Sequence, residues 1–219
     1  MARKNNTMKL VASPTERTTA ATDLILSAAA TGAATYLQLL PQGGAGRTGL
    51  WSWSFGLVAL SAGCGAAYHG LVLADAVRKA LWHVLTVCLG MAISLFVVAV
   101  FQDAGGREAA QRALPIMLAA GLLIFGISRM LPGLFIVFIL YEALALLAAF
   151  AAYAWMAASG TLGGAGWIAA GVLVSMIAAG IQTARHLHVN FVWEFDHNGM
   201  FHLVQVLGLI LICLGLSRG

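Results

Sequence analysis

The sequence predicts an all-α, polytopic membrane protein, a bundle of seven transmembrane helices. Of its 219 residues, 61% are hydrophobic and only 9% are charged, whereas soluble domains carry about 25% charged residues. So few charges cannot cover a water-exposed surface, and most of the surface must therefore face lipid. Apolar segments also recur along the chain, each with the ~20 residues that a helix needs to cross the hydrocarbon layer. These observations exclude a soluble enzyme, a disordered chain and a disulfide-stapled secreted module.

The amino-terminal half predicts a polar tail followed by three spans. Residues 1–20 are polar and lack the short apolar core of a cleaved signal peptide, so we expect a cytoplasmic tail. The first helix is predicted at 21–40, and the run Pro41-Gln42-Gly43-Gly44 ends it. The second and third helices are predicted at 50–74 and 79–101, the third ending before an Asp-Ala-Gly-Gly turn.

The carboxy-terminal half predicts four more spans. The fourth helix is expected at 113–130, with Pro115 in its first turn, where proline is tolerated. The fifth is expected at 132–157 and begins with another proline. Glycine-rich breaks then separate the sixth and seventh helices, which are expected at 164–184 and 199–217.

Residues 21–219 are predicted to form a single transmembrane domain. The loops and tail on its two membrane sides carry unequal numbers of basic residues. Cytoplasmic loops carry an excess of Lys and Arg, and eight of the 12 lie on the amino-terminal side. We therefore expect a cytoplasmic N-terminus, and the Ala- and Gly-rich composition suggests a bacterial inner membrane. The net charge of +4 is then a topology signal, and no nucleic-acid partner is expected. The eight are Arg3, Lys4, Lys9, Arg17, Arg78, Lys79, Arg129 and Arg185; the other side holds Arg47, Arg107, Arg112 and Arg218.

The six histidines are predicted to gather at one membrane face. Polar groups inside a membrane are costly and commonly mark functional sites. Neutral imidazole is the commonest metal ligand, and three imidazoles with a water complete a catalytic zinc site. We therefore predict zinc bound by the helix-borne His69, His83 and His202, with His197 as a further candidate ligand. The remaining two, His186 and His188, lie in the loop before the last helix.

Polar residues at helical spacing around these histidines are expected to orient the ligands from a second layer. Asn198 lies four residues before His202 and shares its helix face, and Gln205 lies three residues after it. Ser61 shares a face of the second helix with His69.

Two carboxylates at the same depth, Asp23 and Asp196, are candidate catalytic residues that would carry protons. Zinc lowers the pKa of a bound water to about 7. The expected activity is hydrolysis of a lipid amide or ester from a cytoplasm-facing site.

The stretch Gly63-Cys64-Gly65-Ala66-Ala67-Tyr68-His69 resembles the second-helix signature of the CREST superfamily, which includes alkaline ceramidases, progestin and adipoQ receptors and Per1-like proteins. His202-Leu203-Val204-Gln205 is similar to its seventh-helix motif. The resemblance implies a divergent member of a group of zinc-dependent amide hydrolases that act on membrane lipids. The family's Ser falls on Gly65, its Asp near Ala80, and the first His of its His-x-x-x-His motif on Asn198, so these three positions differ.

Three other functions use the same bundle. A non-catalytic receptor or sensor would keep the histidine metal site without turnover. A b-type haem protein would use two facing histidines as axial ligands. A transporter is the third alternative, although no internal repeat is evident. A membrane lipid is the expected substrate or ligand of the protein, and a homo-oligomer is compatible with the sequence.

Overall fold

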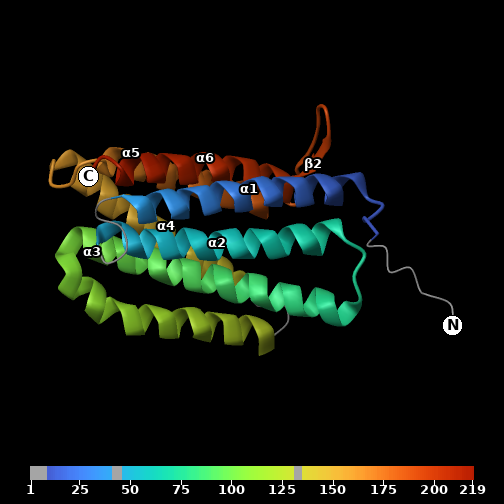
Figure 1. Ribbon diagram of the computed structural model, residues 1–219, viewed down its shortest axis with the longest axis horizontal. Coiled ribbons are helices and arrows are strands. Elements are labelled where there is room, and N and C mark those ends of the chain that lie inside the picture. Colours follow the sequence, from blue (N-terminus) through green and yellow to red (C-terminus); the bar gives the residue numbers. More distant parts are fainter. Residues whose placement is uncertain (1–8, 41–45, 131–134) are drawn as a thin grey trace.

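The computed structural model describes residues 9–40, 46–130 and 135–219, and these form an almost entirely helical bundle (Figure 1). Within these ranges the chain has six helices and one short β-hairpin. The elements are α1 (Pro14–Leu39), α2 (Arg47–Gly70), α3 (Asp75–Met130), α4 (Phe135–Ala158), α5 (Ala165–Thr183), β1 (His188–Asn190), β2 (Glu194–Asp196) and α6 (His197–Leu216).

Helix α1 begins at Pro14, earlier than the predicted start at residue 21, so residues 14–20 of the predicted polar tail are helical. Ser13 caps the helix by accepting a hydrogen bond from the Glu16 N–H, and proline suits the first helical position. The early turns are polar, yet Thr19 is 1% exposed because it packs against the start of α6. Tertiary contacts that hydropathy does not reveal therefore extend the helix.

The predicted third and fourth helices are the two limbs of the single element α3. Gly106 interrupts the helical backbone with φ 76° and ψ −175°, a positive φ that glycine adopts without steric cost. The chain reverses there, and the two limbs run in opposite directions (Figure 1). Ser94 of the first limb donates a hydrogen bond to the carbonyl of Met117 in the second, over 2.7 Å. The limbs therefore pack against each other.

Five helices, α2 to α6, are long and apolar enough to cross a membrane by length and composition, which is consistent with a membrane protein. This count covers the described residues, takes α3 as one element and omits the threonine-rich α1. The prediction of seven spans is therefore not confirmed and stays a prediction. The predicted turn at 41–44 and the predicted helix start at Pro132 lie outside the described residues.

Close helix contacts assemble the bundle around α1 and α6. Helix α1 lies along α2 and α6, and α5 lies along α6. A Cβ at Gly171 of α5 would stand 2.6 Å from the carbonyl oxygen of Gly208 in α6, so glycine permits this approach, as is common between membrane helices. The packing creates two distinct ends. The histidine end holds Asp23, His69 and His202; the arginine end holds Arg47, Asp103 and Tyr153.

Candidate functional site

Three helices bring imidazoles and a carboxylate together at the histidine end. Helix α1 supplies Asp23 from its third turn, α2 supplies His69 from its last turn, and α6 supplies His202 from its second turn. The ends of these helices meet because α1 runs antiparallel to α2 and lies beside α6 (Figure 1). His202 is 8% exposed and Asp23 is 3% exposed, so both groups are withdrawn from solvent.

Both ring nitrogens of His202 have a polar neighbour. The Thr22 hydroxyl donates to the Thr19 carbonyl over 2.9 Å. The same hydroxyl oxygen lies 3.1 Å from His202 Nδ1, and the tautomer of the imidazole sets which group is the donor. The other ring nitrogen, Nε2, lies 3.2 Å from Asp23 Oδ1. The short distance places an imidazole nitrogen beside a carboxyl oxygen, two groups that can each donate or accept a proton.

The second oxygen of Asp23, Oδ2, is buried and has no hydrogen-bond partner among the described residues. It points at Gly65 of α2, where an added Cβ would stand 2.7 Å from Oδ2 and 2.8 Å from Oδ1. Glycine at this position therefore makes room for the carboxylate. An unsatisfied buried acceptor is costly, so this oxygen is a place where a proton donor or a cation would bind favourably.

His69 is held at the rim of the site by Glu16. Its Nδ1 lies 2.7 Å from Glu16 Oε2, and the side chains are 19% and 45% exposed. Glu16 belongs to the first turn of α1, so this contact joins the beginning of α1 to the end of α2. It also fixes the orientation of the His69 ring, as a carboxylate does for a metal-binding histidine.

Asp196 caps α6 beside the buried pair. Its Oδ1 accepts hydrogen bonds from the Gly199 N–H over 2.8 Å and from the Thr19 hydroxyl over 2.9 Å. Burial by itself raises the pKa of Asp196, but these two hydrogen bonds and the nearby His197 and His69 outweigh it, so the pKa lies below its ordinary value. Asp196 is thus an ionised helix cap.

The other predicted site residues are not brought to this pair by the contacts that they make. The ring of His83 packs edge-on against Phe125 of the second α3 limb, at 6.3 Å between centroids. The Ser61 hydroxyl donates to the Leu85 carbonyl over 3.2 Å, and the Gln205 amide donates to the Ser175 hydroxyl over 3.1 Å.

Two predicted residues lie next to the cap of α6. His197 follows Asp196 directly, and its Nδ1 is buried without a hydrogen-bond partner in the part of the chain that is described. Asn198 follows in the first turn of α6. Across residues 9–40, 46–130 and 135–219, no three His, Cys, Asp or Glu side chains are grouped so that they could hold a metal ion. The predicted set of three histidines is therefore not assembled there.

Glu16, Thr19 and Thr22 were not predicted as site residues, although they supply partners to His69, Asp196 and His202. A signal was present, because residues 16, 19 and 23 recur at steps of three and four and so share one helix face. Assigning residues 1–20 to a tail hid this periodicity.

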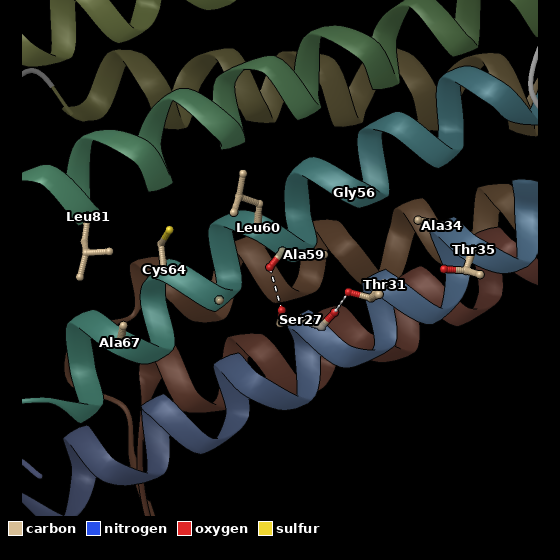
Figure 2. A pocket seen from close by; sticks show the side chains of 11 residues that line it. Ser27, Thr31, Ala34, Thr35, Gly56, Ala59, Leu60, Cys64, Ala67 and Leu81 are labelled. Atoms are coloured by element: carbon tan, nitrogen blue, oxygen red, sulfur yellow. Dashed lines mark hydrogen bonds between the residues drawn. The ribbon is translucent and has the colours of Figure 1, made fainter. Parts of the chain in front are cut away.

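An open groove of about 530 Å³ runs between α1 and α2, and its lining begins at Ser27, one turn after Asp23. Figure 2 shows Ser27, Thr31 and Thr35 of α1 along one wall and small residues of α2 along the other. Ser27 lies one turn after Asp23 and donates to the Ala59 carbonyl over 2.8 Å; Thr31 donates to the Ser27 carbonyl over 2.8 Å. These two hydroxyls are already paired, so the groove offers a mainly apolar surface.

Comparison with known proteins gives a family and no described activity. No curated protein and no solved structure matches the chain. One family model matches residues 18–219, a range that includes Asp23, His69 and His202. The chain therefore belongs to DUF6962, a family of unknown function.

Proposed function

We propose that this protein is an integral-membrane hydrolase of lipid amides or esters, with its reaction centre at Asp23, His69 and His202. One observation carries the proposal. A buried carboxyl oxygen of Asp23 lies 3.2 Å from a buried imidazole nitrogen of His202, and the second carboxyl oxygen meets no partner within the described residues. Buried, incompletely satisfied acid–base groups are characteristic of reaction centres.

The Asp23–His202 pair would move the proton that hydrolysis requires. A water oxygen attacks the carbonyl carbon of the substrate, and the pair accepts the proton that this water loses. The bond from the carbonyl carbon to the leaving nitrogen or oxygen then breaks, and the pair returns the proton to the leaving group. The products are a fatty acid and an amine or alcohol. Such positioned proton transfer contributes about 10²–10⁴-fold to a rate.

Zinc is implied by the resemblance to the CREST superfamily, and the donor types at the site suit it. Two imidazoles and a carboxylate are common zinc ligands, and the unpaired Asp23 Oδ2 described above is an acceptor that a cation would satisfy. The position of the family's Ser falls on Gly65, where the Asp23 carboxylate now lies. Because no three His, Cys, Asp or Glu side chains are grouped for a metal ion among the described residues, zinc is proposed on the resemblance, with His69 and His202 as the residues that would hold it after a rearrangement of their side chains. Zinc bound there would supply Lewis-acid polarisation of the carbonyl and activation of water.

The proposed substrate enters from the bilayer. Both limbs of α3 and α1 would cross the membrane with α2, α4, α5 and α6, giving seven spans. The 56 residues of α3 would extend about 84 Å as one straight helix at ~1.5 Å per residue, far more than a bilayer, so the reversal at Gly106 suits two crossings. The histidine end would face the cytoplasm of a bacterial inner membrane. An acyl chain would lie in the α1–α2 groove, whose α1 wall includes Ser27, one turn after Asp23.

The test uses full-length protein in proteoliposomes containing ceramides, N-acyl lipids or ester lipids. Fatty acid release would be measured by mass spectrometry and bound zinc by elemental analysis. We expect His69→Ala and His202→Ala to lose both zinc and product. His83→Ala is the matched control, because its ring packs within α3, and it should keep both. Absence of release from all lipid classes, or unchanged zinc and release in the first two variants, would contradict the proposal.

A further inference from the structure

The hairpin between α5 and α6 is amphipathic. Its strands are antiparallel, and Val189 pairs with Phe195 while His188 pairs with Asp196 and Asn190 with Glu194. Successive side chains in a strand point to opposite faces. One face of the strands therefore carries polar residues, and the other carries Val189 and Phe195. In the turn, the Phe191 N–H donates to the Trp193 carbonyl over 3.3 Å, and the Trp193 ring lies 6.4 Å from that of Phe195.

The tip of this hairpin exposes large apolar side chains. Phe191 is 89% exposed, Val192 69% and Trp193 66%. Apolar area left in water is unfavourable, and a contiguous exposed apolar patch marks an interaction surface. The polar opposite face shows that the hairpin has one side suited to water and one side suited to another medium.

The position of the hairpin indicates which medium this is. It connects α5 and α6, both apolar enough to span a membrane, so it lies at the level where these helices leave the hydrocarbon. Figure 1 shows it projecting sideways from the bundle, across the helix axes. A hairpin with this direction extends over the surrounding lipid, along the membrane plane. Phe195, on the apolar face, lies beside Gly199 in the first turn of α6.

The same end of the bundle carries another aromatic and basic cluster. Tyr68 and Trp82 lie 5.6 Å apart between ring centroids, and the Arg78 guanidinium lies 4.4 Å above the Tyr68 ring. Tryptophan and tyrosine are enriched at the head-group level of bilayers. Trp193 would extend this aromatic belt beyond the edge of the bundle.

We infer that the hairpin of residues 188–196 binds the lipid surface, with its apolar face in the boundary between head groups and acyl chains. The inference rests on the membrane crossing of α5 and α6 in the proposed function, and it is independent of the hydrolytic activity. A soluble partner protein is the competing occupant, and the experiment separates the two.

The experiment places an environment-sensitive fluorophore at Val192→Cys in a variant whose three native cysteines are replaced by alanine. The protein is reconstituted into phosphatidylethanolamine–phosphatidylglycerol vesicles. We expect the label to be several-fold less accessible to aqueous iodide than the same label at Ala12→Cys, an exposed site just before α1. Spin-labelled lipids with a shallow spin label should quench it more strongly than deep ones. A label at Leu207→Cys, 57% exposed on α6, should show the deep pattern.

Equal iodide access at positions 192 and 12, with position 207 shielded, would overturn the hairpin inference and leave the membrane proposal standing. Iodide access at position 207 would overturn both. A second measurement retains the native cysteines: Trp193→Phe should lower the share of tryptophan emission that head-group-proximal brominated lipids quench. An unchanged share would contradict lipid contact at the tip.

Discussion

The two ends of the bundle each bury a carboxylate, and the partners of these carboxylates differ. At the arginine end, Asp103 has a side chain that is 1% exposed. Its Oδ1 lies 2.7 Å from Arg47 Nε, and its Oδ2 accepts from Arg47 Nη2 over 3.3 Å and from the Tyr153 hydroxyl over 2.7 Å. At the histidine end, the Asp23 side chain is 5% exposed, and its contact is with the His202 imidazole through Oδ1.

This difference separates a structural carboxylate from a candidate reactive one. Arg47 is permanently charged and presents a fork that fits a carboxylate, so Asp103 is neutralised in one fixed arrangement that joins α2, α3 and α4. An imidazole can donate or accept a proton through its ring nitrogens, and in the described chain the second Asp23 oxygen has no hydrogen-bond partner. Equal burial therefore has different consequences according to whether the neighbouring group can exchange a proton.

Replacing each carboxylate by its amide gives the largest expected contrast in stability. Asp103→Asn leaves the buried Arg47 charge uncompensated, and loss of one partner of a buried ion pair costs about 3–5 kcal/mol. Asp23 has no permanently charged partner, and asparagine has nearly the same shape as aspartate. Asp23→Asn should therefore change the free energy of unfolding by under ~1 kcal/mol. Thermal unfolding in one detergent measures both. Similar losses of stability would remove the distinction between the two ends.

Filling the space beside Asp23 should have an intermediate effect. In Gly65→Ala, the new Cβ would stand 2.7 Å from Asp23 Oδ2, and such overpacking costs about 1–3 kcal/mol. Gly63→Ala is the control, because its Cβ would meet the Ser27 hydroxyl at an ordinary 3.5 Å. The double variant Asp23→Ala/Gly65→Ala removes the clash, so the two changes should be non-additive in thermal unfolding. Additive losses would show that the carboxylate does not occupy this space.

Removing the cap of α6 should cost less stability than overpacking at Gly65, and the cost should depend on pH. Asp196→Ala is expected to cost about 1 kcal/mol at neutral pH. The pKa of folded Asp196 lies below its ordinary value, because its hydrogen bonds and the nearby histidines outweigh burial. Its ionised form therefore contributes stability above the unfolded pKa of about 3.9, and this contribution disappears as the pH falls through the folded pKa.

The matched control for this pH dependence is Ser13→Ala, which removes the uncharged cap of α1. Unfolding midpoints of the two variants and the wild type across a pH series provide the measurement. The Ser13→Ala penalty should stay constant, whereas the Asp196→Ala penalty should shrink at acid pH. A constant penalty in both would rule out an ionised Asp196 cap.

The sequence predicted the helical class, most helix positions and the placement of Asp23, His69 and His202 at one end, because apolar length and turn residues are local signals. It did not predict the rotation of each helix. His83 turns towards Phe125 because the second limb of α3 folds back beside the first, and this contact is remote in sequence. The start of α1 was missed for a similar reason, since its polar turns are buried by α6. The role of Gly65 depends on Asp23, which lies beside it on another helix, and this contact is also remote in sequence.

The most direct test of the reactive role of Asp23 is fatty acid release by Asp23→Asn in proteoliposomes, at equal amounts of folded protein. The amide cannot accept a proton as the carboxylate does, so release should fall by about 10²-fold or more while the unfolding midpoint stays near that of the wild type. Release at the wild-type rate from the folded variant would contradict a reaction centre at the histidine end.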